Sequence, residues 1–192
     1  MLVGSIHPEE VVVIRTLLLG ILGSLILFSW GFIGHVALGI YDPAYQHFED
    51  ESAVAAVLED NAHGAGLHYL PAEPLRDGSQ AEAFVNFVPA GERSGFGAMV
   101  RRDLLVGVIS VFLVLILLAG DRRGGYWRSV GRFSLAGFAL GFVTHAYYWN
   151  WFDFPATYFA ISVVDQVIAW TLVGLALTPL LGRRGSDVGE GS

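Results

Sequence analysis

The chain contains no cysteine and no lysine among its 192 residues. The absence of cysteine excludes disulfide bonds, thiolate metal sites and cysteine nucleophiles. The 11 basic residues are therefore all arginines, and 18 acidic residues outnumber them, which gives a formal net charge of −7. Because no broad basic face can form, we expect no nucleic-acid partner.

Charged residues of either sign are also scarce. They make up 15% of the chain, whereas ordinary soluble domains contain about 25%. Hydrophobic residues reach 54%. The catalytic signatures GxSxG, Walker A, GxGxxG, HExxH and CxxC are all missing from the sequence. The composition predicts a membrane protein and favours one that is not an enzyme.

Four long apolar runs account for this hydrophobicity, at residues 16–38, 104–120, 133–152 and 157–181. A helix needs about 17–25 residues to cross a hydrocarbon core of about 30 Å. The runs do not alternate with a period of two, so helices are predicted rather than barrel strands. The predicted fold class is an all-α membrane protein, a four-transmembrane-helix bundle.

A cleaved signal peptide is the alternative interpretation of the first run, with the small residues 37–39 as its processing site. The run is longer than the usual apolar core of such a peptide, about 7–15 residues. A retained helix is therefore predicted.

The arginines are distributed unevenly about the four runs. Seven lie on one side and four on the other. The first group is Arg15, Arg122, Arg123, Arg128, Arg132, Arg183 and Arg184, and the second is Arg76, Arg93, Arg101 and Arg102. Basic residues near helix ends stay in the cytoplasm. We therefore predict a multi-pass protein of the bacterial inner (plasma) membrane, with both termini inside the cell.

The predicted organisation has four parts. Residues 1–40 form a cytoplasmic N-terminus and the first transmembrane helix. Residues 41–103 form an acidic periplasmic insertion, residues 104–182 contain transmembrane helices two to four, and residues 183–192 form a disordered cytoplasmic tail.

The insertion contains eleven acidic residues and four arginines, which gives it a net charge of −7. Apolar residues at helical spacing in "ESAVAAVL" predict a short helix that ends by Gly64. Alternating side chains on both sides of Asp77 and Gly78 predict a β-hairpin. A small extracytoplasmic α/β unit is therefore expected between the first two helices.

Polar residues inside the apolar runs are candidate functional residues, because ionisable groups are costly at membrane depth. They are His35, His145, Asp165 and the adjacent Gln166. Only a few residues join the third and fourth runs, so these helices should be antiparallel neighbours. His145 and Asp165 would then meet, and His35 would reach the same layer.

Four interpretations of this buried polar constellation remain open. A His–Asp pair can relay protons. His35, His145 and Asp165 can hold a divalent metal, and the two histidines can ligate a haem. Alternatively, the pair is a buried hydrogen bond that locks two helices together. No cofactor is predicted as the leading interpretation, because no tight metal-binding spacing is present.

Aromatic residues crowd the end of the third run. The group comprises Tyr147, Tyr148, Trp149, Asn150 and Trp151. Amphipathic rings are typical of the membrane–water interface, which makes an aromatic belt the leading interpretation. A groove for a lipid headgroup, quinone or pigment is the alternative. Gly137 and Gly141 form a GxxxG pair in the same run, which indicates close packing between helices.

Several of these segments together resemble a family of hypothetical bacterial four-helix integral membrane proteins. The resemblance rests on "FSWGFIGHVALGIYD", "FEDESAVAAVL" and "GLHYLP" in the first half and on "YYWNWFDFPATYFAISVVDQVIAW" in the second. It implies a shared four-helix fold and brings no activity. It also implies one constellation formed by Trp30, Trp149, Asn150, Trp151, Pro155, Asp165 and Gln166.

The sequence favours a non-catalytic function. We expect an accessory or scaffold subunit that docks on another membrane protein or complex, or on a second copy of itself, within the lipid bilayer. The alternatives are a membrane protein that binds a metal or cofactor through His35, His145 and Asp165, and a protein that handles a lipid or quinone through its outer aromatic groove.

Overall fold

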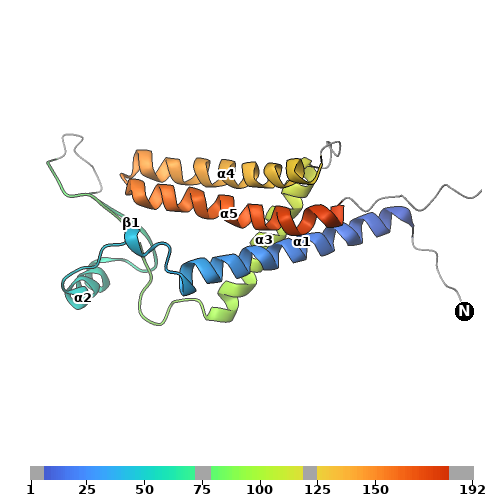
Figure 1. Cartoon of the computed structure of the whole chain (residues 1–192). Coiled ribbons are helices and arrows are strands. Elements are labelled where there is room, and N and C mark those ends of the chain that lie inside the picture. Colours follow the sequence, from blue (N-terminus) through green and yellow to red (C-terminus); the bar gives the residue numbers. More distant parts are fainter. Residues whose placement is uncertain (1–6, 72–78, 119–124, 182–192) are drawn as a thin grey trace, which may run out of the picture. The chain divides into compact units, whose positions relative to one another are not determined.

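The computed structural model describes residues 7–71, 79–118 and 125–181. Within these ranges the chain is mostly helical and contains one small two-stranded sheet (Figure 1). It divides into two compact units, Met1–Ala44 with Val100–Ser192, and Tyr45–Met99. The predicted turn at Asp77–Gly78 and the predicted disordered tail lie outside the described residues.

The first helix, α1, extends over Pro8–Phe32 and continues directly into a π-helical turn, η1, at Ile33–Ala37. Pro8 occupies the first helical position, where its missing N–H is no loss and its fixed φ suits the helix. The Glu10 carboxylate accepts a hydrogen bond from the His7 backbone N–H at 3.1 Å. The helix starts eight residues before the apolar run at residues 16–38. Hydropathy identifies only the apolar part of a helix, whereas the hydrogen-bonded helix extends further into polar residues.

Three further long helices complete the first unit. They are α3 (Phe96–Leu118), α4 (Tyr126–Trp151) and α5 (Ala156–Leu181). α4 and α5 lie side by side, α1 packs along α5, and α3 runs across α1 (Figure 1). Phe133, Val173 and Leu177 are completely buried and belong to one apolar core with residues of α1 and α3.

Small residues let the helices of this unit approach closely. Gly23 of α1 faces Val111 of α3, where an added Cβ would lie 2.8 Å from the valine side chain. The neighbouring Ser24 hydroxyl donates to the Leu104 carbonyl at 2.8 Å. Gly137 and Gly141 of α4 both face α5. In this chain the GxxxG pair therefore serves intramolecular packing.

The second unit contains the small α/β element that the sequence predicts. Its helix α2 (Glu51–Asn61) is capped by Asp50, whose carboxylate accepts from the Ala53 N–H at 2.9 Å. The Ser52 hydroxyl and then this backbone bond lower the pKa of Asp50. Strands β1 (Gly66–Leu70) and β2 (Ala83–Phe87) pair antiparallel.

Among the described residues, two helical segments are long and apolar enough to cross a membrane, Glu10–Ala37 and Ala156–Leu181. α3 carries Arg101, Arg102 and Asp103 near its start, and α4 ends in polar aromatic residues. Length and composition of the described helices therefore support two of the four predicted spans.

Candidate functional site

The most connected polar residue of the helical unit is Asp165 in α5, which is only 5% exposed. Its Oδ1 accepts a hydrogen bond from the Trp30 indole N–H at 2.7 Å. Its Oδ2 accepts from the Tyr41 hydroxyl at 3.2 Å and lies 3.6 Å from Nε2 of His35. All three partners come from residues 30–41, so one carboxylate fastens the end of α1 and the following turn to α5.

Trp30 and His35 contact the same carboxylate from the two sides of the junction between α1 and the π-helical turn η1. Residues five apart point in different directions on an α-helix, where the repeat is 3.6 residues. A π-helix has i→i+5 hydrogen bonds, and here the Leu38 N–H donates to the Ile33 carbonyl at 2.9 Å. Gly34 permits this turn to pack, because an added Cβ would lie 3.2 Å from Ile40.

Tyr41 is the second buried donor to Asp165, with 8% of its surface exposed. Its ring stacks on His35 with centroids 4.4 Å apart, and it contacts Tyr158 at 5.8 Å. Burial raises the pKa of Tyr41 to about 12; the Ser162 hydroxyl opposes this rise, and the Asp165 carboxylate adds to it. The phenol therefore remains a neutral hydrogen-bond donor at any physiological pH.

Ser162 lies one helical turn before Asp165 on the same side of α5 and is completely buried. Its hydroxyl makes no hydrogen bond of standard geometry within the described part of the chain, although it is close enough to Tyr41 to influence that pKa. Buried polar atoms without a partner are uncommon in proteins.

His145 is placed differently from the sequence-based expectation. Its Nδ1 lies 2.9 Å from the Gly141 carbonyl one turn earlier in α4, and its ring contacts Tyr158 edge-on at 5.9 Å. One nitrogen of the imidazole is therefore engaged within its own helix, and it is His35 rather than His145 that approaches Asp165. Gln166 packs its side-chain carbons toward Gly141.

The structure does not gather His35, His145 and Asp165 into one ligand set. Within the described ranges, no three His, Cys, Asp or Glu side chains are arranged to hold a metal ion. Two of the groups around Asp165 are the Trp30 N–H and the Tyr41 hydroxyl, both of which donate hydrogen bonds to it. The arrangement is a hydrogen-bonded carboxylate with a histidine beside it.

The aromatic group that the sequence predicts to lie at a membrane interface occupies the last turns of α4. It contains Tyr147, Tyr148, Trp149, Asn150 and Trp151. Its rings pack on one another and on the start of α5: Trp149 stacks on Phe159 at 5.5 Å, and Tyr147 contacts Trp151 at 6.5 Å. Trp149 and Trp151 keep much of their surface exposed, as rings at a membrane interface would.

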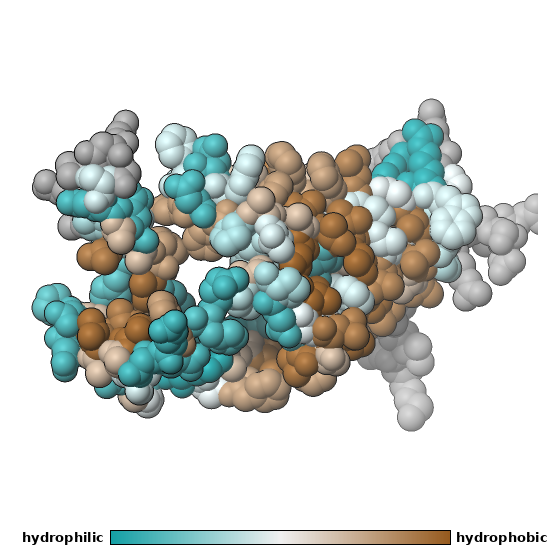
Figure 2. All heavy atoms as spheres, turned by 60° about the vertical axis from the view of Figure 1, so that its left-hand side comes forward, coloured by the Kyte–Doolittle hydropathy of each residue, from teal (hydrophilic) through white to brown (hydrophobic). Residues whose placement is uncertain are grey.

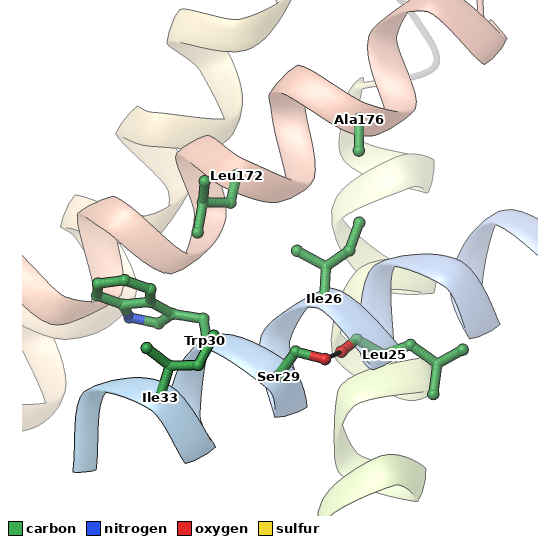
Figure 3. A pocket seen from close by; sticks show the side chains of 7 residues that line it. All are labelled: Leu25, Ile26, Ser29, Trp30, Ile33, Leu172 and Ala176. Atoms are coloured by element: carbon green, nitrogen blue, oxygen red, sulfur yellow. Dashed lines mark hydrogen bonds between the residues drawn. The ribbon is translucent and has the colours of Figure 1, made fainter. Parts of the chain in front are cut away.

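An open apolar groove of about 390 Å³ lies between α1 and α5 (Figure 3). Its lining residues are Leu25, Ile26, Ser29, Trp30, Ile33, Leu172 and Ala176. The Ser29 hydroxyl donates to the Leu25 carbonyl at 2.7 Å, so it is satisfied within α1. In Figure 3 the Trp30 ring reaches toward α5, which makes this ring a wall of the groove as well as a donor to Asp165.

Sequence reasoning from the residues missed Tyr41 and Ser162, while the family resemblance grouped Trp30 with Asp165. Tyr41 was placed in the insertion, and Ser162 looked like an ordinary small residue in an apolar run. The chain matches no protein-family model, no curated protein and no solved structure. Its function is therefore argued from geometry and charge.

Proposed function

We propose that this chain is a four-helix integral protein of the bacterial inner membrane. The observation that carries the proposal is the set of large apolar side chains exposed on all four long helices. Brown, hydrophobic residues cover much of the surface seen in Figure 2. They include Val13, Leu18 and Val36 of α1, Leu105, Leu113 and Leu117 of α3, Leu135 and Val143 of α4, and Val164 of α5.

The buried side chains of the same helices also support this proposal, because several of them are polar. Ser24, Ser162, Asp165 and Thr178 are all buried, although they are polar. A water-soluble protein has little reason to expose Leu117 at 80% while it buries a carboxylate. In lipid the exposed aliphatic side chains incur no penalty, and the polar groups belong inside the bundle.

The proposed topology has both termini and the α3–α4 connection in the cytoplasm, with the insertion in the periplasm. The arginine distribution supports it. The aromatic residues at the end of α4 then serve as anchors at the periplasmic interface. Lipid is the solvent for α3 and α4 as well as for α1 and α5.

Single-cysteine labelling tests this topology directly, because the natural chain has no cysteine. In intact cells, a membrane-impermeant maleimide should label Glu59→Cys in α2. It should label Trp127→Cys, at the start of α4, only after the membrane is permeabilised. The two sites are both exposed, so accessibility in the folded protein is matched. Labelling of Trp127→Cys from outside would contradict the topology.

Within the membrane, we propose a non-catalytic role as an accessory or scaffold subunit that docks on another membrane protein. The support is that the buried carboxylate is engaged by donors of its own chain, which is a structural use. The sequence also lacks the common catalytic signatures. The helices offer long apolar faces, and the exported unit is small.

Crosslinking in cells followed by extraction in mild detergent tests the docking role. Cysteines at Leu113 of α3 and Val143 of α4, which are 54% and 72% exposed, probe two different helices of the apolar exterior. We expect one of the two variants to give a specific adduct with a second protein, and the other variant to serve as its control. A product of twice the 20.8 kDa chain mass would identify self-association. A clean monomer from both variants would count against the proposal.

A further inference from the structure

We propose that His35 and Asp165 form a proton-binding site, and that protonation of His35 fastens the end of α1 to α5. The inference concerns a property of the chain itself and does not depend on any docking partner. It rests on the geometry around one buried carboxylate and on the position of one half-exposed histidine.

The histidine is the exposed member of the cluster. The His35 side chain is 49% exposed, whereas that of Asp165 is 6% exposed. Histidine is the side chain whose charge ordinarily changes between about pH 5 and 8. His35 stands two residues before the end of the apolar segment Glu10–Ala37, so a proton from the aqueous side can reach the cluster through it, while Trp30 and Tyr41 cover the carboxylate on other sides.

The distance between the two side chains permits a second arrangement in which they are hydrogen-bonded. Nε2 of His35 lies 3.6 Å from Oδ2 of Asp165, which is longer than a hydrogen bond. An imidazolium donating to a carboxylate shortens to about 2.7–2.9 Å and is roughly twice as strong as a neutral bond. Protonation should draw His35 onto Asp165, and the segment of residues 30–41 should tighten against α5.

The other titratable groups near the pair lie in the chain after η1, in α4 and in α5. Tyr41 does not titrate in this range, because burial raises its pKa to about 12. Tyr158 of α5 contacts Tyr41, and His145 of α4 lies against Tyr158 rather than against the carboxylate. Asp42, in the 3-10 turn η2 (Asp42–Ala44) that packs on α5, places its carboxylate close to Gly39.

Ser162 is a further polar group of this cluster. The Ser162 hydroxyl is fully buried beside Tyr41 and has no hydrogen bond of standard geometry among the described residues. A hydroxyl can rotate to donate or to accept.

The Trp30 indole is a built-in reporter, because its N–H is bonded to the carboxylate. Tryptophan fluorescence of the full chain in detergent micelles is recorded from about pH 5 to 8. The fluorescence of the Trp30→Phe variant, which comes from the other four of the five tryptophans, is subtracted. We expect one transition in the natural protein, no transition in His35→Gln, and an unchanged transition in His145→Gln, which is the matched histidine control.

Thermal unfolding gives a second, independent measurement. Under this proposal, protonation adds an imidazolium–carboxylate pair to the folded state, and loss of the proton removes that pair. The unfolding temperature of the natural protein should therefore fall relative to that of His35→Gln as the pH rises. His35 is half-exposed, so this variant should fold, which circular dichroism verifies. The same fluorescence transition in His35→Gln, or none in the natural protein, would overturn the proposal.

Discussion

Replacing Asp165 with alanine is expected to lower the free energy of unfolding in detergent by about 3 kcal/mol. The change leaves the Trp30 N–H and the Tyr41 hydroxyl buried without their acceptor. Each unsatisfied buried donor costs about 1–3 kcal/mol, and interhelical polar contacts in membranes are worth about 0.6–2 kcal/mol. The measurement is chemical unfolding followed by helical circular dichroism.

Two variants separate this role from a general effect of removing an acid. Asp103→Ala deletes an exposed carboxylate of α3 and should change the stability by less than about 0.5 kcal/mol. Asp165→Asn keeps an oxygen that can accept from Trp30 and should fall between Asp165→Ala and the natural protein. Equal stability of Asp165→Ala and the natural protein would show that the carboxylate does not hold residues 30–41 on α5.

Replacing Gly137 with alanine should be comparably damaging, although it adds a single methyl group. The added Cβ would lie 2.5 Å from the Gln166 carbonyl oxygen and 2.8 Å from Cβ of Trp170. Both neighbours are fixed, one by the backbone of α5 and the other by the buried Trp170 ring, which is 2% exposed. The two helices must separate, and overpacking of this kind costs about 1–3 kcal/mol.

Gly131 provides the matched control in the same helix. An added Cβ there meets nothing within 4 Å. Alanine is about 0.8–1.0 kcal/mol better than glycine inside a helix, so Gly131→Ala should be slightly stabilising. The two substitutions are chemically identical and should shift the unfolding midpoint in opposite directions. A stabilising effect of Gly137→Ala would mean that α4 and α5 are not in this close contact.

Much of the architecture could be predicted from one-dimensional patterns. The apolar runs predicted a mostly helical chain, and the alternation around Leu67 and Val85 predicted the small antiparallel sheet. The four-residue connection before Ala156 predicted α4 and α5 as antiparallel neighbours. Helix bounds were less accurate, because helices such as α3 continue beyond the apolar residues into charged turns.

The candidate site was only partly predictable. His35 and Asp165 stand out in the sequence because they are ionisable residues in apolar runs. The expected partner of Asp165 was His145, on the adjacent helix in the chain. The structure satisfies His145 at the Gly141 carbonyl and presents His35 to the carboxylate. The π-helical turn that contains His35 has no signature that we recognised in the sequence.

The sequence by itself therefore determined which segments are helical, which are acidic and where the arginines lie, because these properties depend on neighbouring residues along the chain. Tertiary structure decided which polar groups meet. A contact between helices depends on the rotation of each helix about its axis and on the local repeat, and one π-turn at Ile33–Ala37 changes both. The turn contains His35, and the same carboxylate accepts hydrogen bonds from Trp30 in the helix before the turn and from Tyr41 in the chain after it.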